Sequence, residues 1–244
     1  MGNVAQKQKG QIMPTIVFAN PKGGAGKTTA AFLLATELAA RGKIVSIIDA
    51  DPNKPMAEWE SHGGKLDNLT ITVNADEETI LENINDAAEE ADFVIVDLEG
   101  TANLSVAYAI SLADLVIVPA QRSQLDAKEA AKAVALVKRQ EKVTGKTIPV
   151  SILLTKTSPA IRSKGIKRMA ENMKRRSIDT FVIELHEREA FKSVFDYSCT
   201  LSQLTSKQVS LAGLNTAKEN AADYAAEVVR KLKSFKAEQG EMVA

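Results

Sequence analysis

The sequence predicts an α/β fold, a doubly wound and mostly parallel sheet flanked by helices. Short runs rich in Val and Ile alternate with amphipathic helical patterns along the chain. These runs are mostly apolar throughout, as is typical of strands buried on both faces of a sheet. Neither a Pro-rich linker nor an internal repeat divides the 244 residues. The alternation therefore predicts right-handed βαβ units in one large domain.

The expected elements follow each other in regular order. Seven strands are predicted, over Thr15–Asn20, Ile44–Asp49, Leu69–Val73, Phe93–Asp97, Leu115–Pro119, Pro149–Thr155 and Thr180–Glu184. Three amphipathic patterns between them predict helices over Thr28–Arg41, Glu78–Ala88 and Leu125–Thr144. Gly42 and Gly145 follow the first and third helices and are typical residues for ending them. We expect residues 1–13 to form a short flexible arm and residues 14–244 to form the single domain.

Composition excludes several classes of function. Basic and acidic residues each number 31, so only a local patch could attract nucleic acid. Cys199 is the one cysteine, which excludes an internal disulfide and fits a reducing cytoplasm. No apolar run reaches the length of a membrane span. A final helical pattern, roughly Thr216–Lys236, has a narrow apolar side and is expected to pack on its own domain instead of on a membrane.

The stretch PKGGAGKTT, residues 21–29, predicts a phosphate-binding loop. It lies between the first strand and the first helix, which is the context such a loop requires. Gly23, Gly24 and Gly26 allow backbone N–H groups to turn inward around phosphates, and the helix dipole adds positive potential. In such loops the lysine, here Lys27, bridges the β- and γ-phosphates, and the following hydroxyl, here Thr28, binds Mg²⁺. The predicted nucleotide-binding set is Lys22, Gly23, Gly24, Ala25, Gly26, Lys27, Thr28 and Thr29.

The same stretch resembles the deviant Walker A motif, K-G-G-x-G-K-T, of the ParA/MinD family of ATPases. The resemblance implies a P-loop NTPase fold, ATP and Mg²⁺ as cofactors, and an ATP-bound homodimer. It also implies that Lys22 crosses the dimer interface to the partner's phosphates, as an arginine finger does in other NTPases. A solvated loop lysine is the alternative.

Two carboxylate segments resemble other parts of this family. DADPN, residues 49–53, is similar to the switch I pattern D-x-D-P-Q, with Asn53 where Gln is usual. The match implies that Asp51 is catalytic and binds the metal's hydration shell, although Asp and Pro also form simple turns. FVIVDLEG resembles a Walker B strand and implies that Asp97 holds Mg²⁺-bound water. Glu99 is unexpected there; it either orients water or faces solvent.

A further segment, PAQRSQLD, is similar to the family pattern P-x-x-P-S-x-x-D. Arg122 replaces the second proline. Ser123 and Asp126 match positions that build the dimer interface, and Asp126 could receive the signature lysine. An aspartate at a helix N-terminus is equally a common cap, so both roles remain open.

The second half of the chain carries a candidate DNA surface. TKTSP and ELHEREAF are the segments expected near the adenine base. Between them, residues 162–176 hold one acid and seven bases, which are Arg162, Lys164, Lys167, Arg168, Lys174, Arg175 and Arg176. Residues 76–92 hold eight acids and no base. This clustering favours phosphate contacts with DNA over a merely solvated helix face.

The family resemblance is strongest to small ParF-like plasmid partition ATPases and extends to the ParA-like protein of T-DNA transfer. It implies a weak, partner- and DNA-stimulated ATPase in the cytoplasm, associated with the nucleoid. The implied partners are a second copy, non-specific DNA and a small centromere-binding or adaptor protein; membrane binding is not expected. The alternatives are a MinD-like, carboxysome-positioning or conjugation-accessory ATPase, and a nucleotide-dependent scaffold with negligible turnover.

Overall fold

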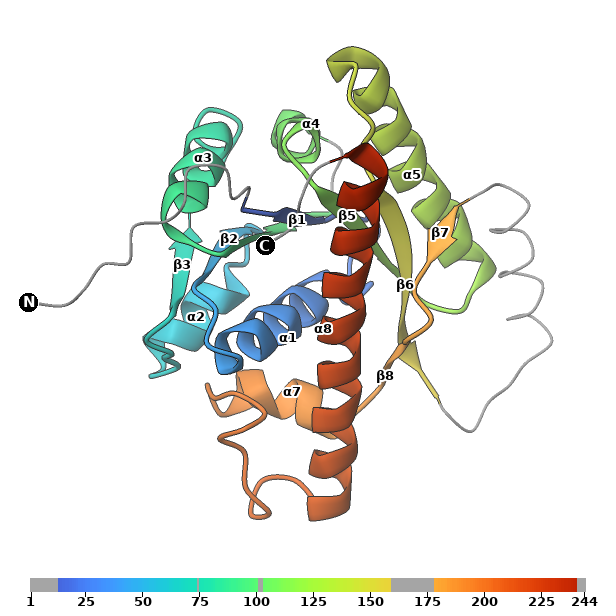
Figure 1. The fold of residues 1–244 in the computed structure, drawn as a ribbon. Coiled ribbons are helices and arrows are strands. Elements are labelled where there is room, and N and C mark those ends of the chain that lie inside the picture. Colours follow the sequence, from blue (N-terminus) through green and yellow to red (C-terminus); the bar gives the residue numbers. More distant parts are fainter. Residues whose placement is uncertain (1–12, 74, 101–102, 159–177, 241–244) are drawn as a thin grey trace, which may run out of the picture.

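A computed structural model describes residues 13–73, 75–100, 103–158 and 178–240 (Figure 1). Its centre is an eight-stranded sheet with the order β3-β2-β4-β1-β5-β6-β7, and β8 pairs separately with β6. Every strand pair is parallel, which confirms the predicted fold class. The strands are β1 (Thr15–Phe18), β2 (Val45–Ala50), β3 (Leu69–Val73), β4 (Phe93–Leu98), β5 (Leu115–Ala120), β6 (Val150–Thr157), β7 (Asp179–Thr180) and β8 (Leu185–His186).

Helices cover both faces of the sheet (Figure 1). They are α1 (Lys27–Ala40), α2 (Pro55–Ser61), α3 (Ile80–Glu90), α4 (Leu104–Ser111), α5 (Gln124–Thr144), α7 (Glu189–Asp196) and α8 (Leu211–Gln239). Ile16 and Phe18 of β1 join one buried cluster with α1, α2, α7 and α8. Val17 lies on the opposite face and joins a second cluster with α3, α4 and α5. A strand buried on both faces explains why its sequence is apolar without alternation.

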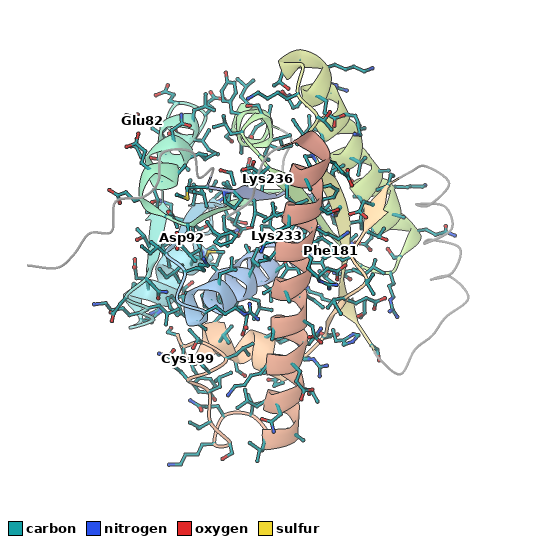
Figure 2. All side chains as sticks on the ribbon, in the orientation of Figure 1. Glu82, Asp92, Phe181, Cys199, Lys233 and Lys236 are labelled. Carbon is teal, nitrogen blue, oxygen red and sulfur yellow. The ribbon has the colours of Figure 1, made fainter. Side chains whose placement is uncertain are left out.

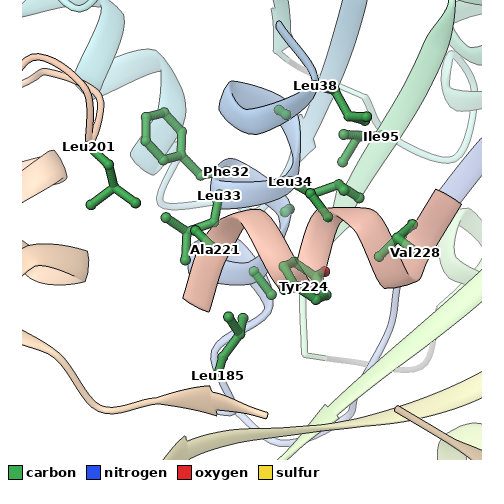
Figure 3. Close-up of a cluster of buried hydrophobic side chains, with 14 of the residues drawn as sticks. Phe32, Leu33, Leu34, Leu38, Ile95, Leu185, Leu201, Ala221, Tyr224 and Val228 are labelled. Atoms are coloured by element: carbon green, nitrogen blue, oxygen red, sulfur yellow. The ribbon is translucent and has the colours of Figure 1, made fainter. Parts of the chain in front are cut away.

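The C-terminal helix packs on its own domain, as expected. Ala221, Tyr224 and Val228 of α8 are fully buried against Leu33 and Leu34 of α1 in one cluster (Figure 3). Near its end, the buried Lys236 (Figure 2) lies 3.6 Å from the carboxylate of Asp114. No helix in the described ranges is both long enough and apolar enough to cross a membrane.

The predicted strand over Thr180–Glu184 is wrong. Two short strands, β7 and β8, flank a segment that leaves the sheet. The reason is a helix side chain: Glu227 of α8 accepts hydrogen bonds from the N–H groups of Val182 and Ile183, both at 2.8 Å. Because these donors bond to a carboxylate, they are not available for the ladder with β6.

Candidate nucleotide-binding site

The phosphate loop joins β1 to α1 in a conformation that glycine favours. Gly24 and Gly26 have φ values of 73° and 92°, in the left-handed region. Thr155 of β6 holds the loop through a hydrogen bond: its hydroxyl donates to the carbonyl of Ala25 at 2.6 Å. A Cβ on Gly26 would come within 3.4 Å of Thr155. No side chain caps the N-terminus of α1, so its first N–H groups remain available to an anion.

A pocket of about 410 Å³ opens above this loop. Six of the predicted nucleotide-binding residues line it: Gly23, Gly24, Gly26, Lys27, Thr28 and Thr29. Asp51 lines it as well, together with Glu99 and Gly100. Lys22 and Ala25 do not belong to the lining. The Ala25 side chain is fully buried, and Lys22 is held elsewhere.

Asp97 is the most perturbed carboxyl group of the site. It is the second-last residue of β4, where its register partners are Phe18 of β1 and Asp49 of β2. The side chain is fully buried, and neither oxygen has a hydrogen-bond partner among the described residues. Burial raises the pKa of Asp97 to about 7, while Thr28 and Lys27 nearby oppose the rise. A buried carboxylate without partners fits a group that completes its bonding when a hydrated cation is present.

The two other aspartates of the strand edge hold the loop after β2. Asp49 is fully buried, and its carboxylate accepts the N–H of Met56 at 3.0 Å, in the first turn of α2. Burial raises the pKa of Asp49, and the hydrogen bond from Met56 opposes that rise. Asp51 accepts both the backbone and side-chain N–H groups of Asn53 at 2.9 Å. Asp49 therefore anchors the strand end. Asp51 forms an Asx turn and also lines the pocket.

Lys22 forms an ion pair within its own chain. Its ammonium lies 2.8 Å from the carboxylate of Asp126, whose side chain is buried. Ser123 caps α5 and also donates its hydroxyl to Asp126. Burial would raise the pKa of Asp126, but the hydrogen bonds from Lys22 and Ser123 outweigh it and lower the pKa. Asp126 thus receives the signature lysine and also takes part in the helix cap.

The segment after β4 is built around a close backbone approach. A Cβ on Gly100 would come within 3.0 Å of the Pro21 carbonyl, so the position favours glycine for lack of space. Glu99 lines the pocket, and its carboxylate accepts the Asn103 amide at 2.6 Å. Asn103 in turn caps α4 by accepting the N–H of Val106. Glu99 therefore connects the pocket to a helix N-terminus.

The expected base segments meet beside the phosphate pocket. Thr155 and Lys156 of the first segment line a second, smaller pocket with Leu185, His186, Glu187, Arg188 and Phe191 of the second. Gly26 and Thr29 border it from the P-loop side. Its apolar side chains and its position suit a purine base attached to phosphates in the larger pocket.

Sequence reasoning did not assign three side chains of this region. Asn20 donates its amide to the carbonyl of Pro119 at 2.6 Å and accepts the N–H of Lys22. Gln121 donates to the carbonyl of Gly24 at 3.0 Å. Lys156 lines both pockets. Their positions could have indicated a role in the site, because all three residues lie at or just beyond the carboxyl ends of parallel strands, where ligands of such sheets bind. The seven predicted DNA-binding residues lie outside the described residues.

Comparison with known proteins agrees with this geometry. Residues 13–234 match the family model described as VirC1 protein. Protein ParA of Rhizobium radiobacter is 36% identical over 220 residues, covering 90% of this chain and 98% of that protein. Protein virC1 of the same organism is 29% identical over 187 residues, covering 75% and 80% of the two chains.

Solved structures match the fold. Apo McdA from Cyanothece superposes with a TM-score of 0.69 at 20% identity, covering 89% of this chain and 99% of that one. A complex of a variant of that McdA with ATP gives a TM-score of 0.68. The resemblance to the ParA/MinD family that the motifs implied is confirmed by the family model and by the relative named ParA. The chain therefore belongs to the VirC1 family, within the ParA/MinD-like P-loop ATPases.

Proposed function

We propose that this protein is a Mg²⁺-dependent ATPase that dimerises when it binds ATP. The observation that carries the proposal is Asp97, a buried carboxyl group whose oxygens have no hydrogen-bond partner among the described residues, behind a P-loop that presents Lys27 and Thr28. Thr28, Asp51 and Asp97 would hold Mg²⁺, which would neutralise charge on the phosphates. Lys27 would bind the β- and γ-phosphates, and the free N–H groups of α1 would add hydrogen bonds. The ATP complex of the related McdA supports ATP as the ligand.

Dimerisation is proposed because Lys22 is not available to its own pocket. Asp126 and Asn20 hold it on the α5 side of the loop. The proposed role of Lys22 is to leave Asp126 and bind the phosphates held by the second subunit. A cation that arrives only on assembly makes hydrolysis depend on the dimer.

The cellular role that we propose is plasmid or chromosome partition in the cytoplasm, on the nucleoid. The likeness to a protein named ParA supports it. The dimer would bind DNA non-specifically through the basic segment 162–176, and a small centromere-binding or adaptor protein would stimulate weak hydrolysis. A conjugation accessory is the second candidate, because the family model and a second relative carry the name VirC1.

The test is ATP hydrolysis by the purified chain, measured with Mg²⁺ alone and with added duplex DNA. We expect slow hydrolysis that DNA accelerates and that Asp97→Ala abolishes. Binding of ATP with no measurable hydrolysis under any of these conditions would favour the nucleotide-dependent scaffold. The binding partner distinguishes the two cellular roles. Retention of the purified chain by a plasmid centromere-binding protein would support partition. Its retention by a conjugation relaxase would support the accessory role.

A further inference from the structure

A third pocket, of about 560 Å³, lies between α2 and the end of α7, two helices that can be followed in Figure 1. It shares no lining residue with the phosphate pocket or with the smaller apolar pocket beside it. Pro55, Glu58, Trp59 and His62 line it from one side of α2, at the spacing of a helix face. Residues 195–198 line it from the end of α7. We call this site the α2–α7 pocket.

The aromatic side chains of the α2–α7 pocket are fixed in place. Trp59 is buried, and its Nε1 donates to the carbonyl of Cys199 at 3.2 Å. Phe32 of α1 packs against both Trp59 and Phe195, with ring centroids 5.0 Å and 4.9 Å apart. A Cβ on Gly64 would come within 2.3 Å of the indole, so the Gly64 backbone packs closely on Trp59. The pocket therefore exists before any ligand binds, which lowers the entropic cost of binding.

The end of α7 places a further aromatic side chain at the pocket. The helix ends in a Schellman motif, in which the N–H of Cys199 donates to the carbonyl of Val194 at 3.0 Å. Ser198 takes the left-handed position of this motif, with a φ of 46°, where glycine is usual. Tyr197, the residue before it, lines the pocket and is 54% exposed. An aromatic ring is thus available to a ligand at the opening of the pocket.

The charged groups of the α2–α7 pocket have one sign. Glu58 and Asp196 are exposed, and neither carboxylate forms a hydrogen bond or ion pair with a residue in the described ranges. On α5, by contrast, Glu129 pairs with Lys132 at 2.8 Å. No lysine or arginine is among the described residues that line the pocket. Two carboxylates beside aromatic rings favour arginine, whose planar guanidinium stacks on rings and binds carboxylates; they disfavour nucleic acids and anionic lipids.

Both helices of the nucleotide site contact this pocket. The carboxylate of Asp49, at the strand edge beside Asp97, accepts the N–H of Met56 in the first turn of α2. Phe32, which packs on the aromatic rings of the pocket, belongs to α1, the helix that begins at Lys27. A ligand that shifts α2 or α1 therefore changes the free energy of nucleotide binding, and nucleotide changes the affinity for that ligand by the same factor.

We propose that the α2–α7 pocket is the docking site for an arginine-bearing, partly apolar segment of a partner protein. This inference rests on the proposed function, because it gives a surface to the adaptor protein that would stimulate hydrolysis. The guanidinium would bind Glu58 and Asp196 and stack on Tyr197, and an apolar neighbour of the arginine would contact Trp59. Tyr, Trp and Arg are the residues that most often carry the binding energy of protein interfaces. The segment would act through α2 and would not enter the phosphate pocket.

The test uses the full chain and a synthetic probe, the peptide acetyl-Gly-Leu-Arg-Leu-Gly-amide. Its control is the same peptide with citrulline, a neutral isostere, in place of arginine. Titration calorimetry measures both affinities. Trp59 is the single tryptophan of the chain, so its fluorescence shows whether the peptide reaches the pocket. We expect a saturable change of this fluorescence with the arginine peptide, and binding of the citrulline peptide at least tenfold weaker.

Paired substitutions test the two carboxylates. Glu58→Gln with Asp196→Asn should weaken the arginine peptide about tenfold. The matched control, Glu60→Gln with Asp67→Asn, removes the same charge from exposed residues outside the pocket and should leave the affinity unchanged. A non-hydrolysable ATP analogue with Mg²⁺ should change the affinity of the wild type for the peptide at least fivefold.

Three results would overturn the docking site while leaving ATP binding intact. They are no saturable change of Trp59 fluorescence at millimolar peptide, equal binding of the citrulline peptide, and equal loss of affinity in the two paired variants. Equal peptide affinity with and without the ATP analogue would overturn the coupling to the nucleotide site. Failure of the wild type to bind the ATP analogue would overturn the proposed function instead, and the peptide titration without nucleotide does not depend on it.

Discussion

At the scale of single residues, two ionisable side chains of the site differ in whether they have a bonding partner when no ligand is bound. Lys22 has a partner, the buried carboxylate of Asp126 at 2.8 Å. Asp97 has none among the described residues. In the proposed cycle, removing Lys22 from Asp126 would cost free energy that ATP and the second subunit would have to supply, whereas a cation near Asp97 would remove an existing penalty. This difference supports a proposed order in which the protein binds the nucleotide first and dimerises second.

The first prediction concerns Asp97 and pH. Because the folded pKa is raised to about 7 from an ordinary value of 3.8, the folded state keeps a proton that the unfolded state has lost between these values. Stability is therefore lost as pH rises toward 7. Asp97→Asn removes this loss, so without nucleotide or metal it should melt above the wild type at pH 8. The difference should shrink toward pH 5.

Thermal melting at several pH values measures this effect. Adding ATP and Mg²⁺ at pH 8 should raise the melting temperature of the wild type and leave Asp97→Asn nearly unchanged. A variant that melts below the wild type at pH 8 without ligand would show that burial does not penalise the Asp97 carboxylate.

At the scale of elements, a strand was predictable where its own residues decide its structure. The predicted strand Leu69–Val73 agrees with β3 at both ends, and β3 pairs in parallel with β2 at the edge of the sheet. The segment after Thr180 was not predictable, because Glu227 binds its N–H groups from 44 and 45 positions away. Likewise, the P-loop could be predicted from its own residues. The bulge at Lys156 could not, because it arises from the pairing of β6 with β8.

The second prediction tests the contact that Glu227 makes. Glu227→Ala leaves the N–H groups of Val182 and Ile183 without their acceptor, and it should lower the free energy of unfolding by about 1–3 kcal/mol. Glu227→Gln keeps one acceptor and should cost less. Urea denaturation measures both. Glu238→Ala, an exposed change on the same helix, should stay within about 0.5 kcal/mol of wild type. Equal stability of Glu227→Ala and Glu238→Ala would refute this explanation of the broken strand.

At the scale of the whole molecule, a neutral chain has unevenly distributed charge. Asp76, Glu77 and Glu78 line a pocket of about 540 Å³ together with Asp49 and Asp51. Glu82 and Asp92 lie on the same α3 side of the molecule (Figure 2). DNA would be repelled from this acidic side, so any contact with phosphates has to come from elsewhere. The basic sequence 162–176 is the proposed place, and a dimer would present it twice.

The third prediction tests this surface. Replacing Arg175 and Arg176 with Glu should abolish ATP-dependent retention of duplex DNA while nucleotide affinity stays unchanged, because the contacts are to phosphates. Binding measured by fluorescence anisotropy at several salt concentrations gives both affinity and salt slope. The matched control exchanges Lys138 and Lys142 of α5 for Glu, with the same change of charge. If the control loses DNA equally, net charge and not this segment is responsible.

In the proposed dimer, Lys22 acts on the nucleotide of the partner subunit. Lys22→Ala and Asp51→Ala should each bind ATP and hydrolyse it poorly. Mixed in equal amounts, they form dimers in which one site keeps its own Asp51 and receives the partner's lysine. Half of randomly formed dimers are mixed and each has one complete site, so the rate should recover to about a quarter of wild type. No recovery on mixing, or normal hydrolysis by Lys22→Ala alone, would contradict the claim.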